Sequence, residues 1–188
     1  MKKYIIVAGV NGTGKSTLYQ AQKELFDNTK RINADEILQK FGGDWRSSID
    51  NIKAMKSEVR EIHSAIENGE SFHVETTLAG NGKPHINIIN SARKNGYEIT
   101  LIYIFVESSD LAVSRVRQRV KKGGHGVSEK LIKDRYVKSI KNLKKIIDLV
   151  DRVMIFDNTE YMELIYERNG NNETRNELQS YPWIDIDK

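Results

Sequence analysis

The chain has 188 residues, of which 38% are hydrophobic and 30% charged, and its formal net charge is +4. This length and composition suffice for one substantial core, and no linker or repeat divides the chain, so we expect a single folded domain. The absence of cysteine excludes disulfides and thiolate metal sites. No stretch has the apolar length of a membrane span and no cleavage site follows the first residues, so we expect a cytoplasmic protein without a membrane partner.

The positive charge is concentrated in one segment. Twelve of the 30 Lys and Arg residues lie between Arg115 and Lys145, together with only two acidic residues. From Asp157 to the end, by contrast, eight acidic residues outnumber three basic ones. We therefore expect residues 115–145 to face anions, and not the C-terminal region.

The first predicted element is an apolar strand over residues 4–8, and the loop after it fits the phosphate-binding pattern G-x-x-x-x-G-K-[ST]. Glycines in this loop allow successive backbone N–H groups to turn inward around a polyphosphate. We expect Lys15 to reach the β- and γ-phosphates and the Ser16 hydroxyl to bind Mg²⁺. The predicted nucleotide-binding residues are Gly9, Asn11, Gly12, Thr13, Gly14, Lys15, Ser16 and Thr17.

Hydrophobic periodicity and turn residues predict that strands and helices alternate along the chain. The other strands are expected at residues 29–33, 71–76, 97–106, 152–156 and 161–167. Helices are expected at residues 15–25, 35–40, 49–68, 84–95, 110–121 and 128–150. This order predicts an α/β protein with the three-layer P-loop NTPase fold, a mainly parallel sheet of five to six strands and a helical lid. We assign residues 1–168 to a P-loop kinase domain with its lid at about 115–145, and residues 169–188 to a polar tail that begins as a loop.

Polar residues follow three of the predicted strands. Ligands gather at the carboxyl ends of parallel strands, so the phosphate loop, Asp35 and the segment Glu75-Thr76-Thr77 should converge on one cleft. Asp35 is the candidate carboxylate that orients an acceptor hydroxyl and takes its proton late in phosphoryl transfer. The alternative is that Asp35 only caps the following helix. Glu75 is a candidate ligand for a substrate hydroxyl or Mg²⁺-bound water, and its alternative is an ion pair with a nearby lysine.

The basic segment has the pattern of a lid, two helices joined by a glycine-rich turn that could close over the phosphates. Arg115 and Arg119 share one helix face and Arg135 lies on the next helix; arginine forks suit phosphate oxygens. Arg119 and Arg135 are therefore candidate catalytic residues, and Arg115 and His125 candidate substrate contacts. His125 could instead order the turn, and the lysines of this segment fit a solvated face.

Together these stretches resemble the zeta-toxin family of P-loop kinases. The resemblance rests on residues 8–17, 31–35, 72–78 and 115–125, on Arg135, Tyr136, Ser139, Asn142 and Leu143, and on Asp157 and Asn158. It implies that Asp35 is the acceptor-side base, that Glu75 and Thr76 contact the substrate, and that lid arginines stabilise the transferring phosphoryl group. One departure is Ser128, which stands where the family pattern has proline.

The resemblance further implies an ATP- and Mg²⁺-dependent kinase of UDP-N-acetylglucosamine, acting as a toxin that an antitoxin restrains. Three alternatives remain open from the residues. A kinase or ATPase of nucleic acid would use the basic segment, but this segment has only one aromatic residue, Tyr136, for stacking bases. A metabolic small-molecule kinase would use the same groups. A nucleotide-dependent switch would need no acceptor-side carboxylate, and no Asn-Lys-x-Asp guanine motif is present.

Overall fold

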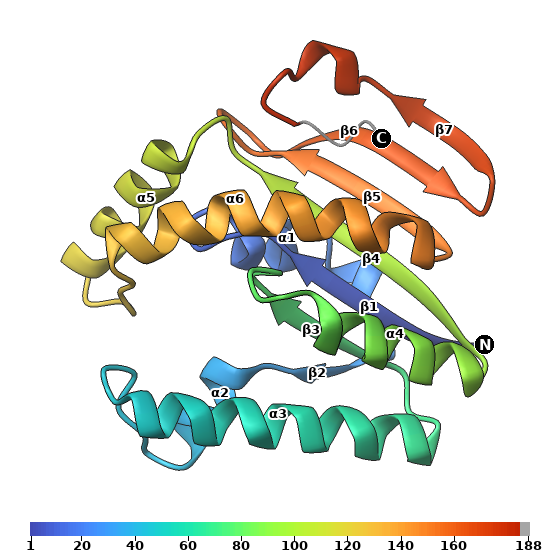
Figure 1. The fold of residues 1–188 in the computed structure, drawn as a ribbon, viewed down its shortest axis with the longest axis horizontal. Helices are drawn as coiled ribbons and strands as arrows, with labels where there is room; N and C mark the ends of the chain where they lie inside the picture. The colour runs from blue at the N-terminus through green and yellow to red at the C-terminus, as the bar shows by residue number, and fades with distance from the viewer. Residues whose placement is uncertain (185–188) are drawn as a thin grey trace.

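The computed structural model describes residues 1–184, which form a seven-stranded sheet with helices on both faces (Figure 1). The strand order is β2-β3-β1-β4-β5-β6-β7. The first five of these strands run parallel to one another, and β6 and β7 are added antiparallel. The predicted α/β fold with a mainly parallel sheet is confirmed.

The strands are β1 (Lys2–Ala8), β2 (Lys30–Ile32), β3 (Phe72–Thr76), β4 (Tyr97–Phe105), β5 (Arg152–Asp157), β6 (Glu163–Asn169) and β7 (Asn172–Asn176). The helices are α1 (Lys15–Ala21), α2 (Ala34–Lys40), α3 (Ser48–Asn68), α4 (Lys83–Lys94), α5 (Ser109–Lys121) and α6 (Glu129–Ile146). Three short 3₁₀ segments complete the described chain: η1 (Lys23–Phe26), η2 (Ile147–Leu149) and η3 (Leu178–Ser180).

The central strand β1 is buried on both faces. Side chains alternate across a strand, so Tyr4 and Ile6 join the larger core, which α3, α4 and α6 cover. Ile5 and Val7 point to the opposite face, where they pack with Leu18 of α1. A third, smaller core joins Val10 of the phosphate loop to α5 and Ile132 of α6. The phosphate loop is thus fixed both to the sheet and to the two helices predicted as a lid.

Two expectations about the elements were wrong. Residues 169–180, expected as a loop, contain β7, which pairs with β6 and raises the strand count to seven. The helix expected over 15–25 ends at Ala21, and the chain continues as η1 after Gln22, whose φ of −136° is not helical.

The long helix α3 is only partly packed against the body. Ile62 and Ile66 are buried as its apolar periodicity indicates, whereas Ile49, Ile52, Met55 and Val59 are exposed. The helix begins before β3 and its first turns lie beside α2 rather than over the sheet (Figure 1). Within residues 1–184, none of the helices combines the length and apolar character that crossing a membrane requires.

Candidate active site

The carboxyl ends of β1, β2 and β3 bring the predicted polar residues to one edge of the sheet. In the parallel register, Ala8 of β1 lies opposite Thr76 of β3, and Ile32 of β2 lies opposite Val74. The phosphate loop follows Ala8, and Asn33 and Asp35 follow Ile32. The predicted convergence of these segments is therefore present.

The phosphate loop has the backbone geometry that its glycines allow. Gly12 and Gly14 have φ values of 92° and 96°, in the left-handed region. A side chain on Gly12 would collide with Ala112 of α5, whose carbonyl oxygen would lie 2.4 Å from the new Cβ. Thr13 is buried, and its hydroxyl donates to the carbonyl of Val10 at 3.0 Å. The conformation of the loop is consequently held by the Thr13 side chain and by the neighbouring helix α5.

Lys15 folds back over this loop. Its Nζ donates to the carbonyl oxygens of Gly9 and Val10 at 2.6 and 3.1 Å. Burial lowers the pKa of the Lys15 ammonium to about 8, while the nearby Glu75 carboxylate partly opposes this shift. Ser16 and Thr17 follow at the start of α1, where both are exposed and line the same cavity.

Asp35 does not cap α2. Asn33 occupies the cap position, and its Oδ1 accepts from the backbone N–H groups of Asp35 and Glu36 at 2.8 and 3.2 Å. The Asp35 carboxylate is 67% exposed, and its Oδ2 lies 3.9 Å from Nδ1 of His125. The capping alternative is therefore wrong, and this carboxylate faces the cavity instead.

Glu75 is the more enclosed of the two carboxylates. Its side chain is 14% exposed, accepts from Asn33 Nδ2 at 2.9 Å and lies 3.4 Å from Nη2 of Arg31. Its cationic partner is thus an arginine of β2 rather than the lysine considered from sequence. The hydroxyl of Thr76 accepts from the N–H of Leu78 at 3.0 Å and so shapes the loop after β3.

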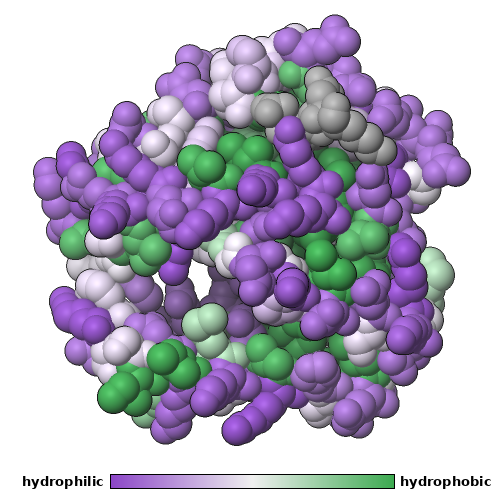
Figure 2. Space-filling model, viewed as in Figure 1, coloured by the Kyte–Doolittle hydropathy of each residue, from purple (hydrophilic) through white to green (hydrophobic). Residues whose placement is uncertain are grey.

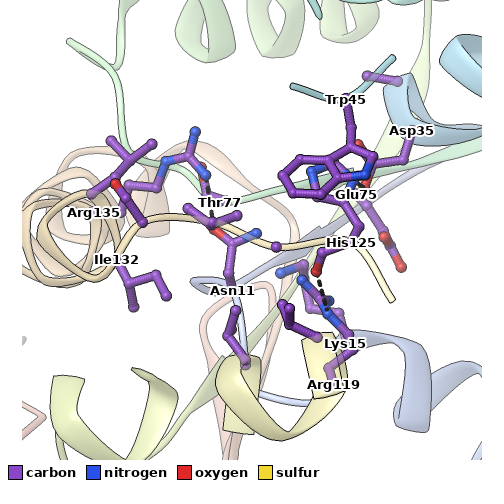
Figure 3. Close-up of a pocket in the computed structure, with 18 of the residues that line it drawn as sticks. Asn11, Lys15, Asp35, Trp45, Glu75, Thr77, Arg119, His125, Ile132 and Arg135 are labelled. Atoms are coloured by element: carbon purple, nitrogen blue, oxygen red, sulfur yellow. Dashed lines mark hydrogen bonds and ion pairs between the residues drawn. The ribbon is translucent and has the colours of Figure 1, made fainter. Parts of the chain in front are cut away.

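The lid arginines divide into two groups. Arg135 Nη1 donates to Oδ1 of Asn11 at 2.8 Å, and Arg119 Nε donates to the carbonyl of His125 at 2.9 Å (Figure 3). Both guanidinium groups lower the pKa of Lys15 through their positive charge, which places them near the phosphate loop. Arg119 and Arg135 line the same cavity as Lys15.

Arg115 is directed elsewhere. Its guanidinium donates to the carbonyl oxygens of Asn158 and Thr159 at 2.7 and 2.8 Å. Asn158 in turn donates from Nδ2 to the carbonyl of Thr13 at 2.8 Å. Arg115 thus braces the loop after β5 against the phosphate loop, a geometry that favours a supporting role over the substrate contact expected from sequence.

His125 lies in the turn between α5 and α6 and contacts the loop between α2 and α3. Its ring stacks on Trp45 in the α2–α3 loop, with centroids 4.8 Å apart and planes 28° apart. Burial and the charges of Arg119 and Arg135 lower the pKa of His125, while Asp35 raises it. Figure 3 shows Trp45, His125 and Asp35 on one side of the cavity and Asn11 and Arg135 on the other.

Three residues of the site were not predicted. Asn33 orients α2 and binds Glu75. Glu58 of α3 accepts from the N–H of Ala34 at 3.2 Å, and burial raises its pKa to about 7. Asn158 touches the phosphate loop. A strand end followed by Asn-x-Asp indicates the cap, whereas no pattern in the sequence distinguishes Glu58 from the other acidic residues of α3.

Lys15, Asp35, Glu75, Arg119 and Arg135 line one cavity of about 1590 Å³ between the phosphate loop, α3 and the lid. Single-ligand pockets usually measure about 300–1,000 Å³, so this cavity has room for two substrates. Among the described residues, no three His, Asp or Glu side chains gather as a metal site. Mg²⁺ in phosphoryl-transfer sites takes most of its ligands from phosphates and water, and the exposed Ser16 hydroxyl with Asp35 and Glu75 nearby fits such an ion.

A phosphate loop at the end of β1, a carboxylate after β2 and arginines on the helices α5 and α6, at one edge of a mainly parallel sheet, define a P-loop kinase fold. The sequence profile of the zeta-toxin family matches residues 1–174. The chain belongs to the zeta-toxin family.

Sequence and structure comparisons give individual relatives. An uncharacterized protein of Haemophilus influenzae (strain ATCC 51907 / DSM 11121 / KW20 / Rd) is 31% identical over 134 residues, covering 71% of this chain and 92% of that protein. In the PezAT toxin-antitoxin system of Streptococcus pneumoniae, a solved chain aligns with a TM-score of 0.63 at 19% identity, over 89% of this chain and 72% of that one.

The complex AvrRxo1-ORF1:AvrRxo1-ORF2 also shares the fold. Its structure with sulphate ions aligns with a TM-score of 0.75 at 15% identity, and its structure with ATP with a TM-score of 0.73 at 14%. Each alignment covers 98% of this chain but only 63% of the other. This chain therefore spans less than two thirds of that relative.

Proposed function

We propose that the protein is an ATP- and Mg²⁺-dependent kinase that phosphorylates a sugar hydroxyl of a nucleotide sugar such as UDP-N-acetylglucosamine. One observation carries the proposal: Lys15, Asp35, Glu75 and two lid arginines line a single cavity large enough for two ligands. A nucleotide-dependent switch would have no use for two carboxylates on the acceptor side. Membership of the zeta-toxin family and a relative solved with ATP support the choice of reaction and nucleotide.

In this mechanism the phosphate loop and Lys15 bind the β- and γ-phosphates. Lys15 exchanges its bonds to the carbonyls of Gly9 and Val10 for bonds to phosphate oxygens. Mg²⁺, held through Ser16, would neutralise charge on the β- and γ-phosphate oxygens. The phosphate loop, Lys15 and Ser16 thus hold the phosphate donor.

The acceptor is held by the carboxylates. Asp35 accepts the hydrogen bond of the acceptor hydroxyl, whose oxygen attacks the γ-phosphorus as the bond to the β,γ-bridging oxygen breaks. ADP leaves, and the hydroxyl proton passes to Asp35 late in the step. Arg119 and Arg135 stabilise the charge on the transferring phosphoryl group, and Glu75 and Thr76 bind other hydroxyls of the acceptor.

The test incubates the purified protein with Mg·ATP and a panel of acceptors, with mass spectrometry to detect one added phosphate. We expect a phosphorylated nucleotide sugar, with Lys15→Ala and Asp35→Asn each reducing its formation by about 10²-fold or more. Asp35→Asn should leave ATP affinity nearly unchanged. Asp110→Asn is the matched control, because Asp110 is an exposed carboxylate in the first turn of α5 that pairs with Lys133 and does not line the cavity.

Two results would contradict the proposal. Full transfer by Asp35→Asn would remove Asp35 from the role of base. Release of ADP and inorganic phosphate with every sugar acceptor, but transfer to an oligonucleotide or another small metabolite, would replace the nucleotide sugar by that acceptor.

We also propose that the protein acts as the toxin of a toxin-antitoxin pair. The support is the family and the PezAT system among its structural relatives. Expression of the wild type from a tightly regulated promoter should arrest growth, and expression of Asp35→Asn should not. Equal growth arrest by the wild type and by Asp35→Asn would show that the toxicity is independent of phosphoryl transfer.

A further inference from the structure

The carboxylate of Glu75 is held partly by side chains that do not line the cavity. Figure 2 shows this cavity as a hollow between α3 and the lid, with hydrophilic residues deep inside it. Glu75 is one of the described residues that line it, whereas Arg31 and Tyr19 are not. Arg31 Nη2 lies 3.4 Å from Oε1 of Glu75, and Asn33 Nδ2 donates to Oε2 at 2.9 Å. Both oxygens of this carboxylate therefore have a partner within the protein.

The guanidinium of Arg31 is fixed by further contacts. Its Nε lies 3.0 Å from Oε1 of Glu36, in the first turn of α2. Its Cζ lies 4.5 Å from the centre of the Tyr19 ring of α1, which is a cation–π contact. The planar guanidinium of one edge-strand residue thus meets two carboxylates and an aromatic face. A lysine ammonium, which is a compact point charge, could not make these contacts together.

Tyr19 supplies the surface on which Arg31 stacks. Its ring packs with those of Phe26 and His73, with centroids 4.3 and 5.4 Å apart. In the described part of the chain, the Tyr19 hydroxyl is buried without a hydrogen-bond partner. Burial and the charge of Glu75 raise the pKa of this hydroxyl while Arg31 lowers it, so both charges lie near the ring. The ring of Tyr19, rather than its hydroxyl, therefore holds Arg31.

The strand β2 carries two ion pairs that differ in their surroundings. Lys30 pairs with Glu70 at 3.5 Å, and their side chains are 47 and 43% exposed. Such exposed pairs contribute little to stability. The partner of Arg31, in contrast, is the 14% exposed Glu75. Removing one partner from an enclosed charge leaves that charge uncompensated, so the Arg31 pair is the one whose loss should be felt in the cavity.

We propose that Arg31 is a positioning residue that holds the Glu75 carboxylate in place as the hydrogen-bond acceptor for a substrate hydroxyl. Each carboxylate oxygen has about two lone-pair sites, so one site on each oxygen stays free beside Arg31 and Asn33. These free sites select a group that donates, such as a hydroxyl, over a carbonyl or ether oxygen that only accepts. Arg31 acts through Glu75 and does not touch the substrate. This role rests on the proposed kinase function; the contact of Arg31 with Glu75 does not.

The first test measures steady-state transfer from Mg·ATP to UDP-N-acetylglucosamine. Arg31→Met removes the guanidinium and should raise the KM of the acceptor about tenfold or more. The kcat and the KM of ATP should change less than about twofold, as expected when binding to the acceptor alone is lost. Arg31→Lys keeps the charge without the fork and should recover part of the loss. Lys30→Met is the matched control, because it removes a cation and its ion pair from the same strand and Lys30 does not line the cavity.

A double-mutant cycle tests whether Arg31 acts through Glu75. In the Glu75→Gln protein the carboxylate is already absent, so adding Arg31→Met should change the KM of the acceptor less than about twofold. Urea denaturation of the same four proteins needs no turnover. Arg31→Met should lower the urea midpoint of the wild type, and should lower that of Glu75→Gln less than about half as much. Tyr19→Leu should raise the KM of the acceptor more than Tyr19→Phe, which keeps the ring.

Three results would overturn the proposal. These are an acceptor KM in Arg31→Met equal to that of the wild type, an equal increase in Lys30→Met, or additive effects of Arg31→Met and Glu75→Gln. If Arg31→Met does not fold, the comparison of Arg31→Lys with Lys30→Met decides in the same way. Phosphoryl transfer with additive effects would refute this inference alone. Absence of transfer to every acceptor, with the coupling in urea intact, would refute the kinase proposal alone.

Discussion

Lys15 links nucleotide binding to pH through its environment. Burial lowers its pKa to about 8 from an ordinary value of 10.5, so a growing fraction of the free protein carries a neutral Lys15 above pH 8. A bound triphosphate favours the charged ammonium and raises this pKa again. Nucleotide binding therefore takes up a proton in alkaline solution.

We predict that ATP affinity falls as pH rises above 8, approaching about tenfold per pH unit for linkage to one proton. Isothermal titration calorimetry at pH 8.5, in buffers of different ionisation enthalpy, should detect this proton uptake, and Lys15→Met should abolish it. The linkage to stability has the opposite sign. Between pH 8 and 10.5 the unfolded chain binds more protons at Lys15, so this group makes the free energy of unfolding rise with pH. If the ATP affinity does not change between pH 7 and 9.5, the buried environment assigned to Lys15 is wrong.

At the residue scale, the sequence predicts best where a motif fixes both residue type and spacing. Gly14, Lys15 and Ser16 occupy the expected loop because, with Gly9, they are the four fixed positions of one short pattern. The partners of Arg115, which are the carbonyl groups of Asn158 and Thr159, could not be predicted. They lie 43 and 44 residues further along the chain, in a loop that only the strand order of the sheet brings close to Arg115. Asn33 was missed because the neighbouring Asp35 offers the same capping chemistry.

The position of α2 depends on its cap. Asn33 satisfies two N–H groups at the start of α2 and also binds Glu75. Loss of an N-cap side chain costs about 0.5–2 kcal/mol, so Asn33→Ala should lower the free energy of unfolding by this amount and misplace Asp35. Asn33→Ser, which keeps a capping oxygen, should retain most of the stability. Urea denaturation checks both variants, and equal stability of Asn33→Ala and the wild type would refute the role of the cap.

The turn between α5 and α6 is held down by the stack of His125 on Trp45. Aromatic pairs contribute about 0.5–1.5 kcal/mol beyond their buried area, so Trp45→Ala should accelerate amide exchange in residues 122–128 by up to about tenfold. Trp45→Phe keeps a ring and should have a smaller effect. Hydrogen-exchange mass spectrometry measures this directly, and unchanged exchange in Trp45→Ala would show that the turn is held by other contacts.

At the scale of elements, helix α3 shows what periodicity alone does not reveal. The spacing of Ile49, Ile52, Met55 and Val59 correctly predicts a helix with one apolar stripe. It does not reveal which turns lie over the sheet, because this depends on where β3 begins relative to α2. The strand β7 was missed for a different reason: all five of its residues are polar and exposed, so no alternation marks it.

The C-terminal segment packs on the main core of the molecule. Ile184 is 5% exposed, and Leu178 and Trp183 pack against the same cluster. Full burial of one such apolar side chain stabilises a protein by about 1.5–3 kcal/mol. A chain that ends after residue 168 should therefore unfold at a lower urea concentration, despite retaining every predicted site residue.

Ile184→Ala in the full chain removes the packing of Ile184 but keeps the pairing of β7 with β6. This substitution should lower the free energy of unfolding by about 2–5 kcal/mol. Tyr161→Ala is its matched control, because Tyr161 is 74% exposed. If the chain ending after residue 168 has the urea midpoint of the full protein, the segment is dispensable and the polar-tail assignment from sequence describes it better.

For the molecule as a whole, alternating strands and helices identify the α/β architecture, and the phosphate loop narrows it to the P-loop class. The strand order was not predicted, since β1 lies between β3 and β4 through pairings that no local pattern encodes. The same limit applies to the cavity, whose walls come from segments more than 100 residues apart.

Both open edges of the sheet are poor templates for another strand. One edge, β2, is three residues long and carries Lys30 and Arg31, and the other, β7, has the sequence Asn-Glu-Thr-Arg-Asn. Short, charged edges oppose edge-to-edge aggregation. The protein should consequently resist the slow formation of fibrils at high concentration, and a partner must recognise it through side chains rather than by extending its sheet.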